Sequence, residues 1–182
     1  MDVNLWLVTG WRGSGKTTFC RKMLQTARLA GWDTAGLLSP AGFQDGIKVS
    51  IFAEDIRSGE KRILAAAHPQ TETDLVFGNW YFNRTTLEWG NQVLQSSIPC
   101  DLLLIDELGP LEFNFSLGWV RALEVIKTSQ FRLALVVIRP ELLERGQQTF
   151  QPNHTIHLDR VDNVNESVLQ YSSGLLRLKV AS

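Results

Sequence analysis

The chain has 182 residues, 44% of them hydrophobic, and its 18 basic and 19 acidic residues give a net charge of −1. This length suits one domain, residues 1–182, and the balanced charge argues against a surface built for nucleic acid or anionic membranes. No apolar run approaches the roughly 18 residues of a membrane span, and no basic leader precedes an apolar stretch. We therefore expect a cytoplasmic protein whose two cysteines, Cys20 and Cys100, are buried free thiols.

A glycine-rich segment near the start of the chain lies between a predicted strand and a predicted helix. Residues 5–9 form an apolar run typical of a buried strand, and residues 17–30 have apolar side chains at helical spacing. The segment between them fits the phosphate-binding pattern G-x-x-x-x-G-K-[ST]. Its residues are Gly10, Trp11, Arg12, Gly13, Ser14, Gly15, Lys16, Thr17 and Thr18. The alternative is a glycine turn followed by a lysine that caps a helix, but the flanking strand and helix favour the phosphate-binding loop.

The chemistry of a triphosphate explains the spacing of this segment. Glycines let backbone N–H groups and the positive end of the following helix converge on a β-phosphate. Lys16 is then expected to act as the catalytic cation at the β- and γ-phosphates, and the Thr17 hydroxyl to bind Mg²⁺. Residues 10–18 are therefore predicted to bind ATP or GTP as the substrate.

The next elements follow from alternating apolar residues and turn signals. Residues 34–39 predict a second strand, which Pro40 ends. Residues 47–53 and 62–66 nearly alternate around a Ser-Gly-Glu-Lys turn and predict an antiparallel hairpin at the sheet edge. Residues 68–78 are expected to be a loop, and residues 80–82 and 84–97 a short strand and a helix. The aromatic residues of this region either stack a nucleobase or belong to the core; they are Trp80, Tyr81, Phe82 and Trp89.

A second stretch that indicates a functional site is the apolar run 102–105, which is followed by Asp106 and Glu107. A strand buried on both faces has no alternation, and its carboxyl end is where open α/β sheets bind ligands. Asp106 is therefore predicted to hold Mg²⁺ together with Thr17, and Glu107 to polarise the attacking water as a general base. The alternative is that two acids merely end a strand. Glu112 is the next candidate base by position.

The remainder of the chain is predicted to complete a mostly parallel sheet. Residues 109–112 are interpreted as a turn, and the longest apolar run, within 132–138, as a central strand. Arg139 follows this strand and either points at the γ-phosphate or is a surface cation. The other predicted elements are helices over 117–128, 141–146 and 164–178 and a strand over 154–158. His154 and His157 would point to opposite faces of that strand, so no zinc site is expected.

Three segments together resemble the thermophile-type nucleoside-triphosphatase family, which includes the human cancer-related nucleoside-triphosphatase. They are residues 10–18, the run D-E-L-G-P-L-E over 106–112, and the F-G-N-W-Y-F segment before a helix. The resemblance implies a RecA-like, three-layer α/β P-loop fold with an added antiparallel hairpin. It also implies Mg²⁺-dependent hydrolysis of varied nucleoside triphosphates, with Gly109 beside Asp106 and Glu107 at the nucleotide. Pro110 departs from the lysine that the family favours.

Two other functions remain open at this point. A small-molecule or nucleotide kinase would need an acceptor pocket and usually a basic lid, for which the hairpin cations Lys48, Arg57, Lys61 and Arg62 are candidates. A nucleotide-switched adaptor for a cofactor-assembly partner would hydrolyse slowly alone, but the guanine-reading N-K-x-D run of GTPase switches is missing. We expect nucleoside triphosphates as ligands, an unidentified protein partner at most, and no nucleic acid or membrane.

The order of the central strands distinguishes the RecA-like fold from the kinase-like fold. A glutamate directly after the metal-binding aspartate typifies RecA-like proteins, in which one strand separates the P-loop strand from the aspartate strand. We therefore predict that the strand over 132–138 lies between the strands over 5–9 and 102–105.

Overall fold

One sheet of ten strands organises the computed structural model, which describes residues 4–158 and 164–180. Its strand order is β10-β1-β9-β8-β2-β4-β5-β7-β6, and β3 pairs with β4 off this path. Five strands run parallel: β1 (Asn4–Thr9), β2 (Thr34–Leu38), β8 (Cys100–Leu108), β9 (Phe131–Ile138) and β10 (His154–His157). The others are antiparallel: β3 (Ala41–Gln44), β4 (Ile47–Asp55), β5 (Lys61–Ala66), β6 (Leu75–Phe77) and β7 (Trp80–Phe82).

The predicted strand order is confirmed. Ala134 of β9 lies opposite Leu5 of β1 on one side and opposite Leu103 of β8 on the other. Parallel strands bring their carboxyl ends to the same edge of the sheet. The ends of β1 and β8 therefore both lie at this edge, on either side of the end of β9. The P-loop and the two carboxylates are thereby placed at one edge of the sheet.

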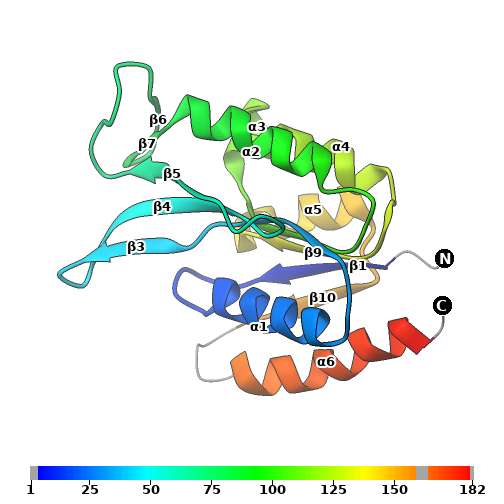
Figure 1. The fold of residues 1–182 in the computed structure, drawn as a ribbon. Helices are drawn as coiled ribbons and strands as arrows, with labels where there is room; N and C mark the ends of the chain where they lie inside the picture. Colours follow the sequence, from blue (N-terminus) through cyan, green and yellow to red (C-terminus); the bar gives the residue numbers. More distant parts are fainter. Residues whose placement is uncertain (1–3, 159–163, 181–182) are drawn as a thin grey trace.

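Helices cover both faces of the parallel part (Figure 1). On one face lie α1 (Lys16–Leu29) and α6 (Val164–Val180). On the other face lie α2 (Arg84–Ser96), α3 (Pro110–Phe115), α4 (Val120–Lys127) and α5 (Leu143–Phe150). A 3-10 turn, Pro140–Leu142, precedes α5. Successive residues of each central strand face opposite layers. Thus Leu103 and Ile105 pack with α2 and α4, whereas Leu102 and Leu104 pack with α1, and all four are fully buried.

The antiparallel extension begins where β2 ends. The predicted hairpin is confirmed as β4 and β5, and Figure 1 shows β3 and β4 projecting beyond the parallel strands on the side of the N-terminal end of α1. Two local predictions were wrong: residues 75–77 form β6 instead of a loop, and residues 110–115 form α3 instead of a turn. Residues 41–44, for which no element was predicted, form β3. Pro110 stands at the first position of α3, where its missing N–H costs nothing.

The cysteine and membrane predictions can be compared with the described residues. Cys20 and Cys100 are both free thiols, the first buried and the second half-buried. Within the described ranges, no helix has the length and apolar character needed to cross a membrane.

Candidate active site

The P-loop connects β1 to α1 in a conformation that depends on glycine. A Cβ atom on Gly10 would lie 2.3 Å from the carbonyl oxygen of Leu158 and 2.4 Å from Ser14 Oγ, so a larger residue does not fit. Gly15, directly before α1, has φ of 90°, a left-handed conformation that glycine adopts at little cost. Ser14 Oγ is buried and has no hydrogen-bond partner in the described part of the chain. The loop therefore depends on glycine and leads directly into the N-terminus of α1, and helix N-termini commonly bind phosphate.

Lys16 lies across the mouth of this loop. Its Nζ donates hydrogen bonds to the carbonyl oxygens of Gly10 at 2.7 Å and Trp11 at 3.0 Å. The same atom lies 4.0 Å from Glu107 Oε2. The ammonium group thus stands between the loop and the end of β8, where it can exchange its carbonyl partners for phosphate oxygens.

Thr17 and Asp106 meet beneath the loop. The Thr17 hydroxyl donates to Asp106 Oδ2 at 2.9 Å, and the backbone N–H of Ser39 donates to the same oxygen at 3.3 Å. Asp106 is only 2% exposed. Burial first, and then the charge of Glu107, raise the pKa of Asp106 to about 6, although Thr17, Ser39 and Lys16 act in the opposite direction.

The Thr17–Asp106 pair fits a magnesium ion in its donor chemistry. Mg²⁺ prefers oxygen ligands and commonly takes one or two from the protein, with waters and substrate phosphates supplying the others. The described residues contain no group of three or more His, Cys, Asp or Glu that could hold a metal ion by themselves. The Thr17 hydroxyl and the Asp106 carboxylate are therefore sufficient to bind Mg²⁺ only when a phosphate of the nucleotide is also a ligand.

Glu107 follows Asp106 through a cis peptide bond and forms an ion pair with Arg139 at the end of β9. Arg139 Nε lies 2.7 Å from Glu107 Oε1. The sequence left the role of Arg139 open between a phosphate ligand and a surface cation. In the structure its partner is the predicted base, because β9 lies beside β8 and both strands end at the site.

Glu112 has a different role from Glu107. It is 6% exposed, and its two carboxylate oxygens accept hydrogen bonds from the backbone N–H groups of Gly109 at 2.8 Å and Trp119 at 2.7 Å. Burial raises the pKa of Glu112 to about 7. This carboxylate joins the start of α3 to the start of α4 and is therefore poorly placed to take a proton from water at the phosphate.

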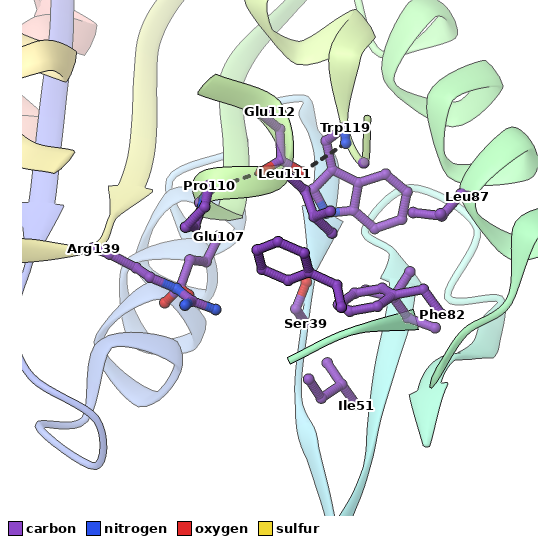
Figure 2. A pocket seen from close by; sticks show the side chains of 14 residues that line it. Ser39, Ile51, Phe82, Leu87, Glu107, Pro110, Leu111, Glu112, Trp119 and Arg139 are labelled. Carbon is purple, nitrogen blue, oxygen red and sulfur yellow. Dashed lines mark hydrogen bonds and ion pairs between the residues drawn. The ribbon is translucent and has the colours of Figure 1, made fainter. Parts of the chain in front are cut away.

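An apolar pocket of about 80 Å³ adjoins the Glu107–Arg139 pair (Figure 2). Its walls come from the antiparallel extension, from α2 and from the segment that follows β8. The apolar lining residues are Ile51, Leu64, Phe77, Phe82, Leu87, Pro110, Leu111 and Trp119, and the remainder are Ser39, Glu107, Gly109, Glu112, Gly118 and Arg139.

The hairpin contributes one cation to the surroundings of the site. Burial lowers the pKa of Lys48, and the positive charge of Arg12 in the P-loop lowers it further. Lys48 Nζ also lies 5.1 Å from the centre of the Trp80 ring. The other hairpin cations proposed as a lid have partners elsewhere: Arg57 with Asp33, Arg62 with Glu60 and the Trp89 ring, and Lys61 with the Phe52 ring.

The predicted site residues divide into a cluster and a rim. Lys16, Thr17, Asp106 and Glu107 come together, whereas Trp11, Arg12, Gly13 and Thr18 lie exposed around the loop. The Cβ position of Gly109 lies 3.4 Å from Arg139 Nε, beside the same cluster. Of the aromatic group, Phe82 and Trp89 both pack against the core, and Phe82 also lines the pocket.

Ser39 is the site residue that the sequence analysis missed. Its backbone N–H contacts Asp106, and its Oγ is buried without a partner in the described residues. The available signal was its position as the first residue after β2, a strand that pairs in parallel with β8. Because the carboxyl ends of paired parallel strands are adjacent, this residue had to lie near Asp106.

Comparisons with known proteins agree with this fold. The model of a family described as NTPase matches residues 6–171. The nucleoside-triphosphatase THEP1 of Caldivirga maquilingensis is 28% identical over 130 residues, which are 71% of this chain and 73% of that protein. The THEP1 of Thermococcus kodakarensis is 26% identical over 162 residues, which are 87% of this chain and 86% of that protein.

Two solved structures share the fold. The solution structure of a human cancer-related nucleoside triphosphatase has a TM-score of 0.67 at 20% identity, covering 96% of this chain and 97% of its own. The crystal structure of THEP1 from Aquifex aeolicus has a TM-score of 0.64 at 15% identity, covering 94% and 98%. They confirm the α/β P-loop fold, in which the central strands are parallel. With the family match over most of its length, the chain belongs to the NTPase family that includes the THEP1 nucleoside-triphosphatases.

Proposed function

We propose that the chain hydrolyses nucleoside 5′-triphosphates such as ATP and GTP to diphosphate and phosphate in a Mg²⁺-dependent reaction. The observation that carries this proposal is the 2.9 Å hydrogen bond from Thr17 to Asp106, with Lys16 and Glu107 beside it. The candidate phosphate-binding loop, two oxygens suited to a metal ion and the carboxylate of Glu107 lie together. Family membership supports nucleoside-triphosphatase activity in general.

Binding of the triphosphate relies on the P-loop. Backbone N–H groups of the loop and the N-terminal end of α1 face the phosphates, and Lys16 gives up the carbonyl oxygens of Gly10 and Trp11 for β- and γ-phosphate oxygens. Thr17 and Asp106 would hold Mg²⁺, which when bound offsets the negative charge on the β- and γ-phosphate oxygens. The Ser39 N–H keeps Asp106 oriented toward Thr17.

Proton transfer is assigned to Glu107. Its carboxylate accepts a proton from the water that attacks the γ-phosphorus, while the bond from that phosphorus to the β,γ-bridging oxygen breaks and the diphosphate leaves. Arg139 holds one oxygen of Glu107 at 2.7 Å, which fixes the orientation of the carboxylate and leaves the other oxygen to face Lys16.

The test is phosphate release from ATP and GTP with Mg²⁺ or with EDTA, in the wild type and in Lys16→Ala. Each charge-assisted hydrogen bond that Lys16 makes to the phosphates contributes about 1.5–3 kcal/mol, so its loss should abolish turnover and weaken triphosphate binding. Lys127→Ala, at an exposed position in α4, is the matched control and should hydrolyse at the wild-type rate. Urea unfolding of both variants verifies that the fold is intact. Wild-type hydrolysis by Lys16→Ala would exclude the P-loop as the site.

A further inference from the structure

The pocket beside Glu107 has dimensions and walls that suit a small apolar molecule. Its volume of about 80 Å³ holds roughly three water molecules, or about three to four non-hydrogen atoms. Ile51 and Phe82 of the extension form one wall, Leu87 of α2 the next, and Leu111 and Trp119 another (Figure 2). A hydrocarbon chain of about three carbons would bury its surface against these side chains.

The polar groups at the pocket differ in their access to a ligand. Ser39 Oγ is buried and unpaired in the described part of the chain, and Figure 2 shows Ser39 between Glu107 and Phe82. Because this oxygen has almost no accessible surface, the carboxylate of Glu107 is the acceptor that a ligand in the pocket can reach. The ligand should therefore combine an apolar body with one hydrogen-bond donor.

The charges at the pocket favour a neutral ligand. Glu107 and Arg139 neutralise one another through their 2.7 Å ion pair, and Glu112 is occupied by two backbone N–H groups. An ionised ligand would lose its hydration among the apolar walls without gaining an unpaired counter-charge, which is unfavourable. A hydroxyl group meets these requirements.

The position of the pocket relative to the triphosphate indicates what such a hydroxyl would do. In the proposed function, the β- and γ-phosphates lie beside Thr17 and Asp106. Glu107 is the next residue after Asp106 in the chain, and it lines the pocket. The nucleobase is attached through the ribose to the α-phosphate, at the opposite end of the triphosphate from the γ-phosphate. A hydroxyl in the pocket is therefore near the γ-phosphorus, where water would otherwise attack.

We propose that this pocket is an acceptor site for a small neutral primary alcohol with an apolar body, and that the protein transfers the γ-phosphoryl group to it. In the transfer, the alcohol oxygen forms a bond to the γ-phosphorus and the bond to the β,γ-bridging oxygen breaks. The alcohol proton passes to Glu107, and the products are a phosphate monoester and the nucleoside diphosphate. The inference rests on the proposed hydrolysis, since the same nucleotide site and the same base serve both reactions.

The first arm of the test measures binding without nucleotide or metal. Saturation-transfer NMR with propan-1-ol, which has about four non-hydrogen atoms, should show transfer from the protein to its methyl group. Ethane-1,2-diol has the same number of non-hydrogen atoms and primary hydroxyls but no apolar body, so it should show none. Ile51→Trp fills the pocket and should abolish the signal, whereas Ile63→Trp, at an exposed position of β5 outside the pocket, should retain it.

The second arm measures transfer from Mg²⁺-ATP by ³¹P NMR. With about 50 mM alcohol against about 55 M water, random capture would give about one ester per thousand phosphates, and a bound acceptor should raise this to at least about one per hundred. Ile51→Trp should return the ratio to the random value, whereas Ile63→Trp should keep the wild-type ratio.

The outcomes separate this inference from the proposed hydrolysis. If phosphate is released but the ester stays at the random ratio, the acceptor site is excluded and the hydrolase remains. If neither product forms, the proposed hydrolysis fails as well. An ester yield that is equal in the wild type and in Ile51→Trp would exclude this pocket as its source. Competition between the alcohol and ADP for binding would instead assign the pocket to the nucleobase.

Discussion

Replacing Asp106 with asparagine should stabilise the nucleotide-free protein while impairing its function. The pKa of this 2% exposed carboxyl is raised from its ordinary 3.8 to about 6, mainly by burial. The folded state therefore binds more protons than the unfolded state between these values, and stability falls as the pH rises through them. A shift of about 2 units corresponds to about 3 kcal/mol of destabilisation, fully present above about pH 6.

Asparagine removes this cost but retains a carbonyl oxygen that can accept from Thr17 and Ser39. Its amide N–H groups need new partners, so we expect a gain of about 1–3 kcal/mol at pH 8 and little gain at pH 4. Urea unfolding with EDTA and without nucleotide measures the difference at both pH values. Asp45→Asn removes the same charge at the exposed β3–β4 turn and should show no such pH-dependent gain.

A result in which Asp106→Asn is less stable than the wild type by the same amount at pH 4 and pH 8 would refute the reasoning. It would mean that the ionised carboxylate is well compensated by its neighbours. The same variant should lose the Mg²⁺ dependence of triphosphate binding, measured by calorimetry, because it lacks a charged metal ligand.

Three further predictions concern other residues of the site and the core. Glu107→Gln should lower single-turnover phosphate release about 10²- to 10⁴-fold while triphosphate affinity by calorimetry stays nearly unchanged, because the amide keeps the shape but cannot accept a proton; a wild-type rate would place the base elsewhere. The pKa of Glu112 is raised from its ordinary 4.5 to about 7, so the wild type should lose about 3 kcal/mol of stability between pH 4.5 and 7 that Glu112→Gln does not lose; parallel pH profiles of urea unfolding would contradict this. Gly90→Ala should destabilise by about 1–3 kcal/mol, since the new Cβ would lie 2.3 Å from the buried Trp119 ring, and an unchanged urea midpoint would show that the ring can move freely.

Local patterns in the sequence determined the elements that carry the chemistry. The fully apolar runs predicted β8 and β9 because a strand covered on both faces needs no polar side chains. The glycine spacing of the P-loop predicted its conformation because few other residues fit at Gly10. The hairpin of β4 and β5 followed from alternation on either side of a turn. Short elements were missed: β6 has three residues, too few for a periodic signal, and Pro110 indicates a turn as readily as the first residue of a helix.

Only the tertiary structure decided which of these residues meet. Arg139 pairs with Glu107 across 32 positions of sequence, and the Ser39 N–H reaches Asp106 across 67. No periodic pattern in the sequence predicts either contact, because each depends on the order of β2, β8 and β9 in the sheet and on where each strand ends. The apolar pocket likewise requires the antiparallel extension to lie against α2 and the start of α3. Side-chain periodicity specifies the face of an element, whereas these contacts depend on strand neighbours and strand ends, which are set by packing of the whole chain.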